Sequence, residues 1–327
     1  MSAPDVYGLV RDDLALVEKD LGELLRSELG IVDAIGRYLW EGGGKRIRPA
    51  VVLLAARLCG GEGPLDPSVI RMAAVMEMLH AATLVHDDII DDAKVRRGRP
   101  AVNVTWGNEI SVLMGDWLYM KAFEVTLDQR DFDVLDLLTR MTRSMTEGEL
   151  IQLDVLGSLD ITEAQHLEIV RRKTAYMFRA CAEIGAIVGG GDAAQRKALS
   201  DYGLSAGIAF QLVDDVLDFV STEDKLGKPV ANDLREGKLT LPLIYLLEMG
   251  AAEHRRLVET VIAEGGFETV TREQIFALVR DNGTLDRARQ EARGYAGRAL
   301  EALGGFADSP YREALLSIPN FIVEREM

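Results

Sequence analysis

Helical spacing of apolar residues extends through almost the whole chain and limits the possible fold more than any other feature. Glycine and proline interrupt this spacing at short intervals, and no segment alternates with the period of two that half-buried strands require. The segments with helical spacing cover about residues 5–27, 31–40, 47–59, 67–91, 105–126, 130–155, 162–189, 194–220, 239–249, 253–263, 272–281, 284–302 and 309–318. We therefore predict an all-α fold, and the absence of strand–helix alternation argues against a Rossmann fold or a barrel.

Composition supports one helical domain and limits its partners. Only 9 prolines occur in 327 residues, and no linker-like or low-complexity stretch divides them, so we predict a single domain over residues 1–327. The net charge of −16 argues against nucleic acid as a partner. It would also repel an anionic substrate at long range, so such a substrate would need local basic residues or metal ions.

Features that mark secreted or membrane proteins are missing from the sequence. Cys59 and Cys181 both lie in apolar helical patterns and indicate buried thiols rather than a disulfide framework. Residues 1–10 have neither the basic nor the apolar region of a signal peptide, and no apolar run reaches the roughly 20 residues that cross a bilayer. We predict a cytoplasmic protein without a transmembrane segment.

An acidic stretch ends the helical segment at 67–91. Asp87 and Asp91 are four residues apart, so their carboxylates lie on one helix face and repel each other unless a cation lies between them. Carboxylate pairs of this kind suit Mg²⁺, which also binds substrate phosphates. The alternative is a solvated acidic helix end. Arg96 and Arg97 follow, either as simple charge complements of that end or as ligands of phosphate oxygens.

A second acidic helix repeats the pattern. Asp214 and Asp218 are again four residues apart, and Gln211 precedes Asp214 by one turn on the same face. Two such helices are hard to explain as surface decoration. If they face each other, they form a carboxylate-lined cleft that holds Mg²⁺ and a diphosphate leaving group.

Basic residues that could bind an anion without metal lie upstream. Lys45 and Arg48 follow a run of three glycines and are close enough to hold one diphosphate together. The spacing does not match a Walker A loop, and the alternative is a helix end with solvated charges. His80 lies two turns before Asp87 on nearly the same face. His86, His166 and His254 show no such alignment, so we assign them ordinary structural roles.

Two further features bear on function. Lys173 and Thr174 lie in the middle of a helical segment, where the alternative to a functional role is an exposed pair. Lys228 and Lys238 belong to a glycine-marked stretch after the second acidic helix that is long enough to be a lid. The sequence Gly203-Leu204-Ser205-Ala206-Gly207 matches the G-x-S-x-G pattern of hydrolases. It lies within one long helical pattern, however, so we assign it to close helix packing rather than to a nucleophile elbow.

Taken together, these motifs resemble those of the all-trans polyprenyl diphosphate synthase family. The matching pieces, in the family's order, are Gly43-Gly44-Lys45-Arg46-x-Arg48-Pro49, Asp87-Asp88-x-x-Asp91 with Arg96-Arg97-Gly98, Gly115-Asp116, Gly148-Glu149 with Gln152, Lys173-Thr174, Gln211-x-x-Asp214-Asp215-x-x-Asp218 and Gly227-Lys228. The resemblance implies a helical bundle around a deep central cavity, and proteins of this family usually form homodimers. It also allows a peripheral membrane contact when the product is released. It implies head-to-tail condensation of isopentenyl diphosphate with an allylic diphosphate.

The resemblance also assigns roles to single residues. It implies about three Mg²⁺ ions carried by the allylic diphosphate and held by Asp87, Asp91 and Asp214, with Asp88, Asp215 and Asp218 acting through water or from behind. Isopentenyl diphosphate is assigned to Lys45, Arg48, His80 and Arg97. The allylic diphosphate is assigned to Arg96, Lys173, Lys228 and Lys238, and the reacting cation to Thr174 and Gln211 beside Lys173.

Product length is expected to depend on the residues before Asp87. In the family, a large aromatic residue five positions before the first aspartate stops elongation early; here that position is Ala82, followed by Thr83. We therefore expect a long product, with octaprenyl diphosphate favoured, unless Ala82 only serves helix packing. The alternatives are a shorter-chain (geranylgeranyl or farnesyl) synthase, a terpene cyclase, a non-catalytic subunit and an acidic cation-binding protein. The last three do not account for the basic cluster together with a complete set of aspartates.

Overall fold

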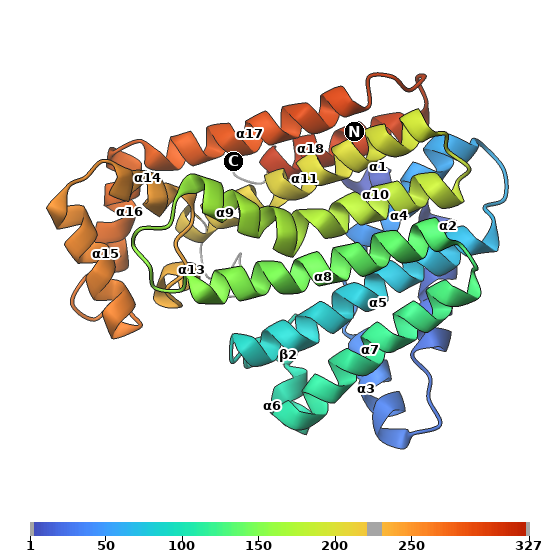
Figure 1. The fold of residues 1–327 in the computed structure, drawn as a ribbon, viewed down its shortest axis with the longest axis horizontal. Helices are drawn as coiled ribbons and strands as arrows, with labels where there is room; N and C mark the ends of the chain where they lie inside the picture. Colours follow the sequence, from blue (N-terminus) through green and yellow to red (C-terminus); the bar gives the residue numbers. More distant parts are fainter. Residues whose placement is uncertain (1–2, 221–230, 325–327) are drawn as a thin grey trace. The chain divides into compact units, whose positions relative to one another are not determined.

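The computed structural model describes residues 3–220 and 231–324. Its elements, shown in Figure 1, are α1 (Ala3–Leu9), α2 (Arg11–Leu24), α3 (Gly30–Glu41), α4 (Ile47–Gly60), α5 (Pro67–Ile90), β1 (Val95–Arg96), β2 (Arg99–Pro100), α6 (Val102–Trp106), α7 (Asn108–Asp128), α8 (Phe132–Asp154), α9 (Glu163–Val170), the π-helical turn η1 (Arg171–Ala175), α10 (Tyr176–Val188), α11 (Ala193–Val220), α13 (Asn232–Arg235), α14 (Leu241–Glu248), α15 (Ala252–Glu264), α16 (Arg272–Asp281), α17 (Thr284–Ala302) and α18 (Pro310–Glu324). The predicted all-α fold is confirmed.

Several predicted boundaries were wrong, each for a local reason. The segment predicted at 5–27 is two helices, α1 and α2, and the one predicted at 105–126 is divided into α6 and α7 by Gly107. Gly107 has φ 87° and ψ 161°, a conformation that a residue with a side chain rarely adopts. The two short strands β1 and β2 pair antiparallel across Arg97 and Gly98, whose positive φ values of 53° and 75° suit a two-residue hairpin turn.

The described residues fall into two compact units. One unit comprises Met1–Thr139, Ala180–Ser200 and Phe306–Leu315, and the other comprises Arg140–Arg179, Asp201–Gly305 and Leu316–Met327. The first is called the N-unit below and the second the C-unit. The single domain over 1–327 and the deep central cavity remain predictions.

Helix α5 is the core of the N-unit. It packs against α2, α4 and α7, and Val75, Met76, Met78 and Leu79 are completely buried. A helix that is apolar on all sides must be buried, and this burial fixes where its acidic C-terminal end lies. Among the described helices, α5 alone is long and apolar enough to cross a membrane by its length and composition. However, 67% of its most apolar window is buried in the structure, as in the core helix of a water-soluble fold.

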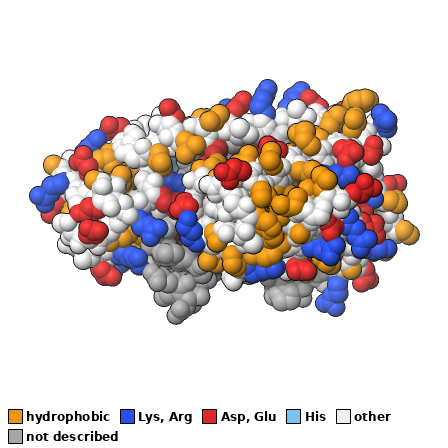
Figure 2. All heavy atoms as spheres, turned by 90° about the horizontal axis from the view of Figure 1, so that it is seen from below, with side chains coloured by type: hydrophobic (Ala, Val, Ile, Leu, Met, Phe, Trp, Pro, Cys, Tyr) orange, Lys and Arg blue, Asp and Glu red, His pale blue; other side chains and the backbone are white. Residues whose placement is uncertain are grey.

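One apolar stripe of the N-unit stays on the surface. Leu113, Met120 and Leu127 on α7 are 67%, 64% and 44% exposed. They recur every seven residues and therefore share one side of the helix. Figure 2 views the molecule from the side on which α6 and α7 lie in Figure 1 and shows hydrophobic side chains gathered at the surface.

The C-unit is built around α11 and α14. Its buried side chains come from α11, α14, α16 and α17 and include Val213, Val216, Leu243 and Tyr245. Gly203 and Gly207 of α11 contact the segment before it. A Cβ atom at Gly203 would lie 2.5 Å from the carbonyl oxygen of Phe178, and one at Gly207 would lie 2.7 Å from the Cα of Ala175. The assignment of the G-x-S-x-G sequence to close helix packing is confirmed.

Candidate functional site

The carboxylates at the acidic end of α5 point in different directions. The Asp91 N–H donates to the Asp87 carbonyl at 2.8 Å, so both half-buried side chains lie one helical turn apart. Asp88 points inward and is 2% exposed. Its Oδ1 accepts from Arg96 Nε at 2.8 Å and also from Arg96 Nη2. Burial raises the pKa of Asp88, while Arg96 opposes that shift, so Asp88 and Arg96 hold each other in place.

The β1–β2 hairpin carries its arginines toward the glycine loop after α3. A Cβ atom at Gly44 would lie 2.8 Å from Arg97 Nη1, so a side chain here would displace this guanidinium. Arg99 lies over the Tyr38 ring, 4.0 Å from its centroid, and fixes the hairpin against α3. The loop and the hairpin therefore form one surface.

Three of the residues assigned to isopentenyl diphosphate lie together with an excess of positive charge. The pKa of His80 is lowered well below its usual value by burial and then by Arg48 and Arg97. The pKa values of Arg48 and Arg97 are also lowered, mainly by burial, while Glu77 opposes both shifts. Arg48 and Arg97 each help to lower the pKa of His80, so the local field is positive and would stabilise a bound anion.

Lys45 lies at the edge of this cluster. Its carbonyl accepts from the Tyr7 hydroxyl at 2.5 Å, and its side chain is exposed. Within residues 3–220 and 231–324 we find no acceptor for its ammonium group. A pocket next to the cluster combines basic side chains with apolar ones; those on its lining include Tyr38, His80, Ala81, Leu84, Arg96 and Arg97. Charged and apolar groups in one pocket suit a ligand that has both an anionic head and a hydrocarbon part.

The residues proposed to set product length lie in α5, where Ala82 is buried and Thr83 is half-buried. Ala82 has no exposed surface, and Thr83 Oγ1 donates to the His80 carbonyl at 2.8 Å. Neighbouring Ala81 contributes to the pocket instead. The passage of a product tail beside Ala82 therefore stays a prediction.

A second pocket, in the C-unit, brings together four of the predicted residues. Lys173, Thr174, Gln211 and Lys238 all line it. Lys173 and Thr174 lie in the π-helical turn η1, which was not predicted; such turns are frequent at functional sites. Lys173 Nζ contacts Gln152 Oε1 at 2.9 Å and Glu149 Oε2 at 2.6 Å.

A hydrogen-bonded chain orients the polar groups of this pocket. Thr174 Oγ1 donates to Gln211 Oε1 at 2.9 Å, and Gln211 Nε2 donates to Asp215 Oδ1 at 2.9 Å. Because a carboxylate only accepts, the amide of Gln211 must turn its nitrogen to Asp215 and its oxygen to Thr174. Buried His166 lies 3.0 Å from the other oxygen of Asp215. His166 has the structural role that was assigned to it, and it performs this role inside the pocket. Its spacing of seven residues from Lys173 is the sequence feature that could have indicated this position.

The second acidic helix ends in contact with the segment that follows it. Asp218 is 1% exposed, and its Oδ2 accepts from the Asp233 N–H at 3.2 Å, at the start of α13. Asp214 is half-buried. Lys228, assigned to the allylic diphosphate, lies outside the described residues. Asp87 and Asp214 belong to different units, so their facing across a cleft stays a prediction.

The donor set fits Mg²⁺ that is shared with a substrate. In the described ranges no group of three or more His, Cys, Asp and Glu side chains could hold a metal by itself. The paired carboxylates of Asp87 and Asp91 supply hard oxygen ligands, and Mg²⁺ usually completes its shell with water and substrate phosphates.

Comparisons with known proteins agree with this chemistry. The polyprenyl synthetase family model matches residues 30–279. Octaprenyl diphosphate synthase of Escherichia coli (strain K12) is 36% identical over 326 residues, covering 100% of both chains. The all-trans-nonaprenyl-diphosphate synthase (geranyl-diphosphate specific) of Rhodobacter capsulatus is 39% identical and covers 98% of this chain and 97% of its own. A polyprenyl synthase from Caulobacter crescentus CB15, crystallised with calcium and isoprenyl diphosphate, superposes with a TM-score of 0.93 at 36% identity, covering 100% of this chain and 98% of its own.

Proposed function

The chain belongs to the polyprenyl synthetase family, and we propose that it condenses isopentenyl diphosphate with an allylic diphosphate to make a long all-trans polyprenyl diphosphate. The observation that carries this proposal is the pocket in which His80, Arg96 and Arg97 lie beside apolar side chains, in the same unit as the carboxylate pair of α5. The two features match two diphosphates, one bound by bases alone and one bound through metal.

Isopentenyl diphosphate binds to the basic cluster without metal. Lys45 and Arg48 approach the diphosphate from the start of α4, and Arg97 approaches it from the hairpin beside Gly44. Guanidinium groups bind phosphate oxygens in pairs, so they also fix the direction in which the C3–C4 double bond points. An anion here would oppose the lowering of the His80 pKa, and the imidazole N–H could donate to the diphosphate.

The allylic diphosphate binds at the acidic helix ends. Asp87, Asp91 and Asp214 would hold the Mg²⁺ ions, about three in number by the family resemblance, and Asp88 keeps Arg96 directed at the phosphates. When bound, Mg²⁺ neutralises the negative charge that develops on the departing diphosphate. Lys173 and Lys238, which line the C-unit pocket, complete the contacts to this leaving group. The family resemblance assigns Lys228 to the same role.

The reaction breaks the allylic C1–O bond and forms a bond from that carbon to C4 of isopentenyl diphosphate. The resulting cation then loses a proton, which the released diphosphate takes up. Thr174 and Gln211 steady the allylic cation with their oxygens. The chain from Gln211 through Asp215 to His166 keeps the amide oxygen on the Thr174 side. A preoriented dipole of this kind stabilises developing charge without reorganisation during the step.

Octaprenyl diphosphate is the favoured product. A homodimer is the favoured assembly, and the cytoplasm is the favoured location. Both substrates are multiply charged and do not cross a bilayer unaided. Cys59 and Cys181 are free thiols, as in a reducing compartment. The product is far more apolar than either substrate, so a peripheral membrane contact would assist its release.

Incubation of the purified protein with Mg²⁺, farnesyl diphosphate and labelled isopentenyl diphosphate, followed by sizing of the products, tests the proposal. We expect label in linear chains of seven to ten units, and no product when EDTA replaces Mg²⁺. A cyclic hydrocarbon formed without uptake of label would identify a terpene cyclase, and metal binding without turnover would identify a non-catalytic protein.

A further inference from the structure

We propose that Arg46 is a positioning residue for isopentenyl diphosphate: clamped by Glu18 and Glu77, it fixes the loop from which Lys45 and Arg48 reach the diphosphate. The inference rests on the proposed function, because it adds a residue to the same binding site. Arg46 lines the same pocket as His80 and Arg97, but its guanidinium is bonded to the two glutamates, so it acts through its two neighbours.

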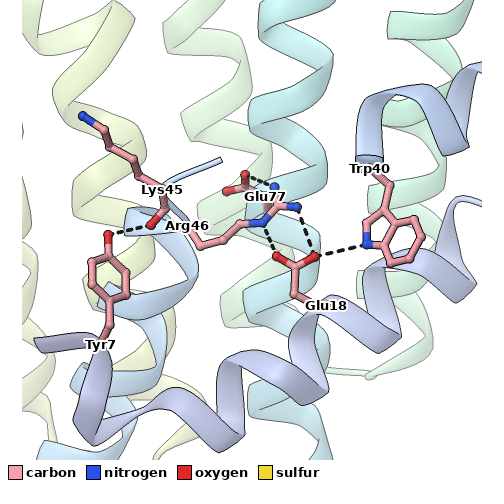
Figure 3. Close-up of polar contacts among 6 residues, drawn as sticks. All are labelled: Tyr7, Glu18, Trp40, Lys45, Arg46 and Glu77. Carbon is pink, nitrogen blue, oxygen red and sulfur yellow. Dashed lines mark hydrogen bonds and ion pairs between the residues drawn. The ribbon is translucent and has the colours of Figure 1, made fainter. Parts of the chain in front are cut away.

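The clamp is a cluster of ion pairs that is buried at Arg46 and Glu77, whereas the Glu18 side chain is 36% exposed. Arg46 Nη1 donates to Glu77 Oε1 at 2.7 Å, Nη2 donates to Glu18 Oε2 at 3.1 Å, and Nε donates to Glu18 Oε1. The side chains of Arg46 and Glu77 are only 11% and 6% exposed. Trp40 Nε1 also donates to Glu18 Oε2 at 3.1 Å, and Figure 3 shows these groups converging. The loop is thus tied to α2, α3 and α5 at once.

The backbone explains why a clamp is needed. Arg46 has φ 48° and ψ 34°, in the left-handed region, which a residue with a side chain adopts only when its surroundings impose it. This conformation directs the Arg46 side chain to the glutamates, whereas the Lys45 side chain extends away from them, as Figure 3 shows. The Tyr7 hydroxyl holds the Lys45 carbonyl at 2.5 Å. Both sides of the peptide are therefore fixed before a ligand arrives.

The clamp also controls charge within the cluster. Glu77 already opposes the lowered pKa values of Arg48 and Arg97, so its field reaches both side chains. With Arg46 in place, the negative charge of Glu77 is largely neutralised. Without Arg46, a buried and unpaired carboxylate would compete with the substrate diphosphate for Arg48 and Arg97. Loss of Arg46 should therefore weaken isopentenyl diphosphate binding through both geometry and charge.

The chain contains a matched control. Arg57, at the other end of α4, pairs with Asp13 of α2, and their side chains are 12% and 13% exposed. Arg57 Nη2 donates to the two oxygens of Asp13 at 3.0 and 2.8 Å. Arg46→Met and Arg57→Met thus each remove one buried arginine that links α2 to α4. They should destabilise the fold alike, but only Arg46 adjoins the proposed substrate site.

The test compares steady-state kinetics of the two variants with those of the parent. We expect Arg46→Met to raise the KM for isopentenyl diphosphate roughly tenfold while the KM for farnesyl diphosphate stays within about twofold, and Arg57→Met to change neither. Arg46→Lys, which keeps the charge but loses the fork, should lie between parent and Arg46→Met. Equal KM values for isopentenyl diphosphate in Arg46→Met and Arg57→Met would overturn the proposal.

Two further variants keep the proposal testable and separate it from the proposed function. Tyr7→Phe removes only the hydroxyl that holds the Lys45 carbonyl, so it decides the matter if Arg46→Met does not fold. A KM for isopentenyl diphosphate raised severalfold supports the proposal, and an unchanged KM refutes it. Lys45→Ala should raise that KM far more than the KM for farnesyl diphosphate. If Lys45→Ala leaves the KM for isopentenyl diphosphate unchanged, the substrate site itself is wrongly assigned. If Lys45→Ala raises that KM but the Arg46 and Tyr7 variants leave it unchanged, only the clamp is refuted.

Discussion

The environment of His80 shows how single side chains are tuned in this molecule. Burial of the His80 ring in α5 lowers its pKa most, and four nearby arginines then disfavour a further positive charge there: Arg48, Arg97, Arg96 and Arg46. The same crowding that keeps the imidazole neutral makes the site attractive to an anion. We therefore expect His80 to lower the free energy of unfolding of the ligand-free protein at acidic pH.

The pH dependence of the free energy of unfolding should reveal this effect of His80. An unfolded histidine titrates with a pKa of about 6.5, whereas folded His80 stays neutral to lower pH. Between these two pKa values the unfolded state binds more protons, so the free energy of unfolding falls as the pH is lowered from about 7. His80→Gln should weaken this decline, as measured by urea denaturation between pH 5 and 7.5. His254→Gln, on α15, serves as control, and parallel curves for the parent and His80→Gln would contradict the prediction.

At the scale of single elements, each acidic helix end combines at least one half-buried carboxylate with buried ones that turn inward, namely Asp88 on α5 and both Asp215 and Asp218 on α11. Asp88 holds Arg96, and Asp218 holds the start of α13. Asp215 orients Gln211. The side chains of Asp87 and Asp214 are half-buried, so we assign them to metal and the inward aspartates to positioning.

Removing one charge from either acidic helix should nearly abolish turnover. Asp87→Asn and Asp214→Asn keep the side-chain shape but withdraw a metal ligand, and each should lower kcat by roughly a thousandfold. Asp92→Asn is the control, since the Asp92 side chain is 78% exposed and pairs with Lys94. Near-parental turnover in a folded Asp87→Asn or Asp214→Asn protein would refute the assignment of that aspartate to metal.

Helix α5 should also limit the length of the product. If the growing tail passes beside Ala82, a phenyl ring there blocks it, and Ala82→Phe should release products of about three or four units while the first isopentenyl diphosphate is still consumed. Because Ala82 has no exposed surface, the larger side chain should also cost about 1–3 kcal/mol of stability. Ala82→Leu should give intermediate lengths. Product sizing by chromatography checks this, and a folded Ala82→Phe protein that makes full-length chains would contradict it.

The sequence predicted these elements because their signals are local. Spacings of three, four and seven residues indicated the helices and the pairs Asp87–Asp91 and Asp214–Asp218. The clamp on Arg46 could not be read in this way, because its partners Glu18 and Glu77 are 28 and 31 positions away. The π-helical turn at Lys173 and the hairpin at Arg97 were also missed, since each is only a few residues long and carries no periodic pattern.

At the scale of the whole molecule, the proposed reaction divides its groups between two units. The basic cluster and the Asp87 end of α5 belong to the N-unit, whereas Lys173, Gln211 and Asp214 belong to the C-unit. The proposed mechanism requires one allylic diphosphate to contact both. Association between copies can contribute to the rigidity that such a site needs, and the apolar stripe on α7 is a candidate surface for it.

We expect the protein to form a homodimer through this stripe. Apolar side chains as exposed as Leu113 and Met120, at 67% and 64%, usually mark an interface when they are aligned. Light scattering after size-exclusion chromatography should give twice the chain mass of 35.9 kDa for the parent protein and a single chain mass for Leu113→Glu combined with Met120→Glu. Leu16→Glu is the control, because Leu16 is 52% exposed but lies on α2. A monomeric parent would refute the dimer. A dimer that persists in the double variant, with circular dichroism unchanged, would place the interface on another surface.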